Sequence, residues 1–97
     1  MSTTEAHPNL CTLTLYSFNR EGKKRWGWRL VAANGEKIAR HSQGGGFKTS
    51  RSAWYNFKLI AFIFRYYELS GTVPKIGSER IYCDYHGEPM LRVRRTS

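Results

Sequence analysis

The order of hydrophobic and polar residues predicts three β-strands followed by a helix. Over residues 10–18, Leu13 and Leu15 alternate with threonine and tyrosine, which is a strand pattern. A second strand is predicted over residues 25–32 and a third over 36–41. The sequence Asn34-Gly35 between them indicates a hairpin with a type I′ turn, in which both central residues have positive φ. A charged turn over residues 19–24, where Gly22 can adopt positive φ, joins the first two strands.

The Asn34-Gly35 turn also sorts the side chains of the second and third strands onto two faces. We expect Ala33 opposite Glu36, Val31 opposite Ile38 and Arg29 opposite Arg40. The other face then carries Trp26, Trp28, Leu30, Ala32, Lys37 and Ala39. That second face has the larger apolar area, which favours it as the face that packs on the helix. The opposed arginines require an anion, a carboxylate or solvent between them.

A helix is predicted over residues 50–69, with Thr49 or Ser50 as its N-cap and Gly71 just beyond its end. One face carries Ala53, Phe57, Ile60, Phe64 and Tyr67, at spacings of three and four. Leu59, Ile63 and Tyr66 widen this apolar arc beyond what one small sheet covers. Two explanations remain open: the C-terminal segment covers part of the arc, or Phe57, Phe64 and Tyr67 form a dimer interface.

The C-terminal third predicts a β-hairpin. Strands are expected over residues 80–85 and 90–94, joined by a turn at 86–89, and Arg92 and Arg94 alternate with Leu91 and Val93. The predicted fold is therefore α+β: a three-stranded antiparallel sheet packed on one long helix, with a C-terminal β-hairpin. Residues 1–9 are expected to be a flexible tail, 10–69 the sheet-plus-helix domain, and 70–97 an extension packed on the same domain.

Composition adds a strong positive charge to this picture. The 97 residues fit one domain and include 16 Lys and Arg against 7 Asp and Glu, a net charge of +9. Such an excess favours a polyanionic partner: DNA, RNA or an acidic protein surface. No apolar run approaches the ~20 residues of a membrane span, and the first ten residues lack a signal-peptide pattern. A cytoplasmic or nuclear location is expected, with Cys11 and Cys83 as reduced thiols.

Basic residues gather on and beside the predicted hairpin and the start of the helix. The candidate nucleic-acid contacts are Lys24, Arg25, Arg29, Arg40, Lys48 and Arg51. The glycine run 44–46 leads into the helix N-terminus, where free N–H groups favour a phosphate, although the spacing is not that of a P-loop. Tyr16, Trp26 and Trp28 could stack on bases if exposed. Their alternation with leucine is more typical of core residues.

Metal binding and catalysis have weaker support. His7 and Cys11 are four residues apart and Cys83 and His86 three apart, so the two pairs could form a tetrahedral zinc site if the strands met. Neither pair has the tight spacing of a Cys-x2-Cys motif. Asp84 and His86 share a strand face, but no third group converges on them. We therefore expect no enzymatic activity, no cofactor and no metal.

The segment 25–63 resembles the YegP-like domain, a small family of unknown function. The matching motifs are Trp26-Gly27-Trp28-Arg29-Leu30, Ala32-Ala33-Asn34-Gly35, Ile38-Ala39 and Gly46-Phe47-Lys48. The resemblance implies a three-stranded antiparallel sheet on one helix, often paired with a second copy, and it implies no function. This chain departs from the family by its triple glycine, its aromatic helix and its extension after residue 70. The order of elements is also similar to DNA-binding domains of plant ethylene-response factors and phage integrases, in which the sheet enters the major groove.

Two functional hypotheses follow from the sequence. The first is a small basic protein that binds DNA or RNA mainly through phosphates. The alternative is a non-enzymatic protein-interaction or inhibitory module, as in a virus or mobile element, that docks on an acidic partner protein as a dimer.

Overall fold

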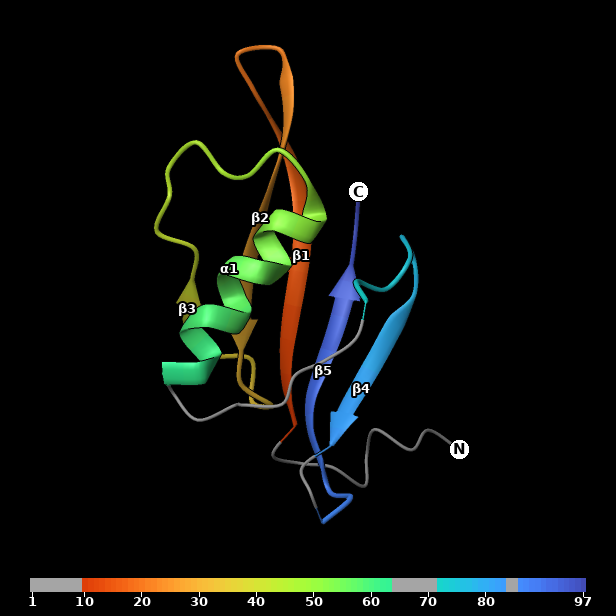
Figure 1. The fold of residues 1–97 in the computed structure, drawn as a ribbon. Coiled ribbons are helices and arrows are strands. Elements are labelled where there is room, and N and C mark those ends of the chain that lie inside the picture. The colour runs from red at the N-terminus through yellow and green to blue at the C-terminus, as the bar shows by residue number, and fades with distance from the viewer. Residues whose placement is uncertain (1–9, 64–71, 84–85) are drawn as a thin grey trace.

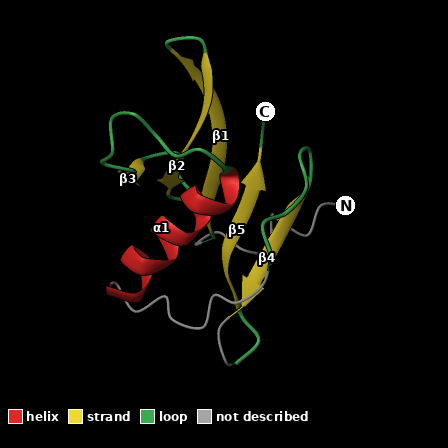
Figure 2. Cartoon of the chain, turned by 45° about the horizontal axis from the view of Figure 1, so that its top comes forward, coloured by secondary structure: helices red, strands yellow, loops and turns green. Residues whose placement is uncertain are grey.

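The structure is a computed structural model that describes residues 10–63, 72–83 and 86–97, with side chains undescribed at 61–63. Its elements are β1 (Cys11–Arg20), β2 (Lys23–Val31), β3 (Lys37–Arg40), α1 (Ser50–Ile63), β4 (Glu79–Cys83) and β5 (Pro89–Arg95). The strands form one five-stranded sheet in the order β3-β2-β1-β5-β4. Helix α1 lies across one face of this sheet, so the molecule has two layers (Figure 1, Figure 2).

The predicted arrangement of three antiparallel strands on one long helix, with a separate hairpin, is wrong. The chain is α+β, but β4 and β5 do not form a separate hairpin. They pair with each other in antiparallel orientation, and β5 also pairs with β1 in parallel orientation, so both strands belong to the same sheet as β1. The pairing runs from Cys11 opposite Leu91 to Leu15 opposite Arg95. The apolar alternation of the two strands is in phase, with Leu13 opposite Val93 and both fully buried. Joining the hairpin to β1 therefore completes one apolar face and removes a free strand edge.

The tryptophan–leucine face packs on α1, as the hairpin pattern predicted. Trp28 is 1% exposed and meets Phe57 edge to face at a ring-centroid distance of 5.2 Å. Trp54 of α1 stacks on both Phe57 and Tyr82, at 5.9 and 5.6 Å, and so links the helix to β4. The Trp28 indole N–H donates to Asn56 Oδ1 at 2.8 Å, which satisfies its buried polar atom.

The core contains one of the three residues predicted to form a dimer interface. Phe57 is 2% exposed and belongs to the cluster that joins α1 to β1 and β2. Its side chain is therefore not available to a second molecule in this arrangement. Phe64 and Tyr67 lie outside the described residues.

The prediction that Gly22 adopts positive φ in the first turn is confirmed, whereas the turn type predicted for the second hairpin is wrong. The positive φ angles of a type I′ turn occur at Glu21 (52°) and Gly22 (77°), between β1 and β2. At the second hairpin only Gly35 has positive φ, at 91°. Its N–H donates to Ala32 O at 2.9 Å, and the Ala32 N–H donates to Glu36 O at 2.8 Å. This is a three-residue loop that ends in a left-handed glycine, so the type I′ prediction for Asn34-Gly35 is wrong.

The altered turn shifts part of the predicted register between β2 and β3. Arg29 does lie opposite Arg40. Val31, however, pairs with Lys37 rather than with Ile38, because the pairing contains an irregularity between Leu30 and Val31. Ile38 is left out of the ladder and is 51% exposed.

Thr49, one of the two predicted N-cap residues, caps helix α1. The Thr49 hydroxyl oxygen accepts the Ser52 N–H at 3.0 Å, which satisfies one of the free donors of the first turn. The predicted continuation to residue 69 and the end at Gly71 fall outside the described residues. In the ranges that the structure describes, no helix has the length and apolar character needed to cross a membrane.

Candidate nucleic-acid interface

The sheet face turned away from α1 carries a row of arginines. Strand side chains alternate between faces, so residues paired with one another across strands share a face. Arg40 pairs with Arg29, Arg29 with Thr14, and Thr14 with Arg94. These pairings place three exposed arginines in one row across β3, β2, β1 and β5. We call this surface the open face and the three residues Arg29, Arg40 and Arg94 the arginine row.

The arginine row has no acidic partner among the described residues. Glu79 of β4 pairs with Arg94 across the strands and lies on the same face, but its Oε2 is 3.4 Å from Arg92 Nε and forms an ion pair with that residue. Arg92 is more deeply covered than the three arginines of the row, with 19% of its side chain exposed. Within the described ranges, no carboxylate comes within ion-pair distance of Arg29, Arg40 or Arg94. Positive charge on the open face is therefore left for solvent or for a ligand.

Tyr16 lies beside the arginine row on the same face. The guanidinium carbon of Arg29 is 5.1 Å from the centroid of the half-buried Tyr16 ring, a cation–π contact that orients the arginine. Across β2, Tyr16 pairs with Gly27. Because Gly27 has no side chain, the ring of His41 can pack directly against its main chain. A Cβ built on Gly27 would lie only 2.3 Å from His41 Cε1.

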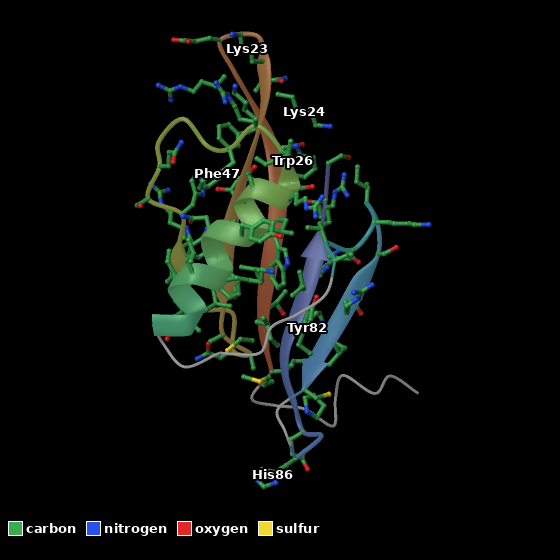
Figure 3. All side chains as sticks on the ribbon, in the orientation of Figure 1. Lys23, Lys24, Trp26, Phe47, Tyr82 and His86 are labelled. Carbon is green, nitrogen blue, oxygen red and sulfur yellow. The ribbon has the colours of Figure 1, made fainter. Side chains whose placement is uncertain are left out.

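His41 fixes the loop after β3 against β2. The side chain is buried, with 8% of the residue exposed, and its Nδ1 lies 3.3 Å from both the main-chain N and the main-chain O of Trp28. The main-chain N–H of His41 donates to the same Trp28 O at 3.0 Å. Further along the loop, the N–H and C=O of Phe47 exchange hydrogen bonds with those of Trp26, at 2.7 and 2.8 Å (Figure 3). The loop that follows β3 is therefore held at two points before α1 begins.

An aromatic pocket opens beside Arg40 on the open face. The rings of Tyr16, Phe18 and His41 lie within 6.0 to 6.3 Å of one another. Together with Arg40 and residues 42–44 they line a cavity of about 220 Å³. The glycine run that was considered as a phosphate loop thus contributes Gly44 to this pocket. Flat aromatic walls beside a guanidinium suit a planar, electron-rich group such as a nucleobase.

The six predicted nucleic-acid contacts do not form one site. Arg25, Arg29 and Arg40 share the open face, although Arg25 is half-buried. Lys24 lies near the β1–β2 hairpin tip, and its ammonium is 5.1 Å from the ring of Trp26, a residue of the other face (Figure 3). Arg51 is in the first turn of α1 and Lys48 lies exposed just before the helix.

Sequence reasoning missed Arg94 as a site residue. Its alternation with Leu91 and Val93 was visible, and it indicated a basic face on β5. The parallel pairing with β1 is what brings that face next to Arg29. Trp26 and Trp28 are buried, at 5% and 1% exposure, so neither ring is available to stack on a base.

The described residues hold no cluster of three or more potential metal ligands. Cys11 is half-buried, and burial raises the pKa of its thiol, which disfavours the thiolate that a zinc ion requires. Cys83 is exposed, and His7 and Asp84 lie outside the described residues.

No family model matches this chain, and neither a curated protein nor a solved structure matches it. The resemblance to the YegP-like domain therefore stays a prediction that rests on its quoted motifs.

Proposed function

We propose that this protein binds DNA or RNA, with the phosphate backbone lying across the open face of the sheet. The observation that carries the proposal is the arginine row: three exposed guanidinium groups on β3, β2 and β5, with Thr14 of β1 between the last two, and without an ion-paired carboxylate among the described residues. A guanidinium donates two parallel hydrogen bonds to a phosphate, so a row of them suits a run of phosphates better than a single anion.

The surroundings of the row support the same ligand. Tyr16 and the aromatic pocket beside Arg40 offer stacking surfaces next to the phosphate contacts. The net charge of +9 would draw polyanions to the surface from a distance.

The test compares two double variants that remove the same charge. Arg29→Ala with Arg94→Ala removes two of the three arginines of the row. The control, Lys75→Ala with Arg80→Ala, removes charge from the exposed stretch before β4 and from a β4 residue that pairs with the buried Val93, on the other face of the sheet. Both are titrated against labelled 5′-hydroxyl single strands, duplex DNA and RNA over a salt series, by fluorescence anisotropy.

We expect the open-face variant to bind at least tenfold more weakly than the control. Its log–log salt slope should be flatter by roughly 1.4 to 1.8, the value for two lost phosphate contacts. Equal losses in both variants would show that binding depends on net charge alone and would refute the site. Absence of binding to every strand form at low salt would refute the function, and an acidic protein surface would then be the partner to examine.

A further inference from the structure

A second cavity, of about 310 Å³, lies on the helix layer of the molecule. Five residues from the first three turns of α1 line it: Ser50, Arg51, Trp54, Tyr55 and Lys58. The opposite wall is formed by Arg95 of β5 and by residues 72–73. The open face and the arginine row are on the other side of the sheet, so the two sites are separate.

The cavity is surrounded by positive charge. Arg51, Lys58 and Arg95 contribute three cations, and none of the described lining residues is acidic. Two of these three cations, Lys58 and Arg95, contact aromatic rings. The Lys58 ammonium lies 4.4 Å from the Tyr55 ring centroid, and the Arg95 guanidinium carbon lies 5.1 Å from that of Trp26. The cations therefore keep their charge available to an anion.

Two buried donors at this cavity lack an acceptor. Trp54 is 1% exposed, and its indole N–H has no hydrogen-bond partner among the described residues. Within the same ranges the Nε of Arg95 is also buried without a partner, although its Nη1 donates to Pro74 O at 3.5 Å. Buried N–H groups are nearly always paired, so two unpaired donors on residues that line one cavity indicate a missing acceptor. Trp28, whose indole N–H reaches Asn56, shows how the same group is satisfied elsewhere in this core.

We propose that this cavity binds the phosphate group of a phosphate monoester. Its oxygens would accept from the Trp54 indole and the Arg95 guanidinium, with Lys58 and Arg51 neutralising the charge. Arg51 is in the first turn of α1, where the free N–H groups and the helix dipole also favour an anion. The volume exceeds that of a phosphate alone, and the Tyr55 ring, 52% exposed, is placed to contact the rest of the molecule.

The indole N–H of Trp54 is a direct reporter of this site. In ¹H–¹⁵N spectra of the full chain, the resonance is assigned by its absence in Trp54→Phe. Titration with inorganic phosphate, at an ionic strength held constant with sodium chloride, should move the Trp54 indole peak downfield and leave the Trp28 peak in place. Lys58→Gln combined with Arg51→Gln should weaken this response at least tenfold. Arg29→Gln combined with Arg40→Gln is the matched control and should leave it unchanged.

Two further probes identify the source of the phosphate. A nucleoside 5′-monophosphate that moves the peak at lower concentration than inorganic phosphate identifies a free small molecule as the ligand. A 5′-phosphorylated oligonucleotide that moves it where its 5′-hydroxyl counterpart does not identifies a strand terminus. A peak that none of the three probes moves, or that sodium chloride moves equally, overturns the proposal. An unchanged response in the Lys58 and Arg51 variant would also overturn it. Because the open-face assay uses 5′-hydroxyl strands, either proposal can fail without the other.

Discussion

Gly27 makes the packing beneath the open face possible, and its replacement by alanine tests that packing directly. A Cβ at this position would lie 2.3 Å from Cε1 and 2.8 Å from Nδ1 of His41, and 3.0 Å from Cζ of Tyr16. The His41 side chain is buried, and the main-chain N–H of His41 is hydrogen-bonded to Trp28 O. The ring therefore has little freedom to withdraw, and we expect the added methyl group to displace the loop that follows β3.

The sign of the change in the free energy of unfolding distinguishes a filled position at Gly27 from an open position in a strand. The φ angle of Gly27 is not in the left-handed region, so alanine carries no backbone penalty there. In an open strand position, Gly→Ala would stabilise the fold by about 0.5–1 kcal/mol through lower unfolded-chain entropy. Overpacking a filled position costs about 1–3 kcal/mol. With the middle of each range, about 2 kcal/mol of cost against about 0.75 kcal/mol of gain, Gly27→Ala should lower the free energy of unfolding by about 1 kcal/mol.

The assay is urea unfolding followed by far-UV circular dichroism, arranged as a double-mutant cycle. His41→Ala alone should destabilise the fold, because it leaves a cavity between aromatic rings. In the double variant the new methyl group occupies part of that cavity, so the combined loss should be smaller than the sum by at least about 1 kcal/mol. A Gly27→Ala protein as stable as the parent, or strictly additive losses, would refute the proposed contact.

Three further predictions concern the turns and the thiols. Gly46→Ala should cost about 2–3 kcal/mol in urea unfolding, since Gly46 has a φ of 70° and its Cβ would lie 2.6 Å from Phe18 Cζ. Gly44→Ala, with open space around it, is the control and should stay within about 0.5 kcal/mol. Glu21→Asn should raise stability by about 0.5–1 kcal/mol, because residue 21 has a φ of 52° and asparagine tolerates that region better; a lower urea midpoint would contradict this. Cys83 should react with a disulfide reagent at pH 8 at least tenfold faster than Cys11, whose pKa is raised by burial, and equal rates would contradict the described exposures.

Features set by neighbouring residues could be predicted from the sequence. The alternation of Trp26, Trp28 and Leu30 with small and charged residues favoured the face that packs on α1, without deciding it. The pairing of Arg29 with Arg40 was expected from a turn at Asn34-Gly35, and the helix cap was expected at Thr49 or Ser50. Each of these depends on contacts close along the chain or on one strong amphipathic pattern.

Features that depend on distant contacts could not be predicted in this way. Nothing in the local pattern of β5 shows that it pairs with β1, because a hairpin and a strand of a larger sheet have the same alternation. Arg94 was therefore absent from the predicted site. The type of a turn is similarly ambiguous: Asn34-Gly35 fits both a two-residue and a three-residue loop, and the choice moved Ile38 out of register.

The position of β1 at the centre of the sheet has a consequence for how the protein folds during synthesis. Strand β1 can pair with β2 as soon as both are made, but its other neighbour is β5, which follows every other described strand in the chain. A nascent chain that ends before β5 would expose one edge of β1 and the apolar face that Leu91 and Val93 complete. We therefore expect the sheet to close only after β5 has been made, and to close slowly, because the contact between β1 and β5 spans a long stretch of sequence. A ribosome-bound chain stalled before β5 emerges should be degraded by proteases that spare the released protein.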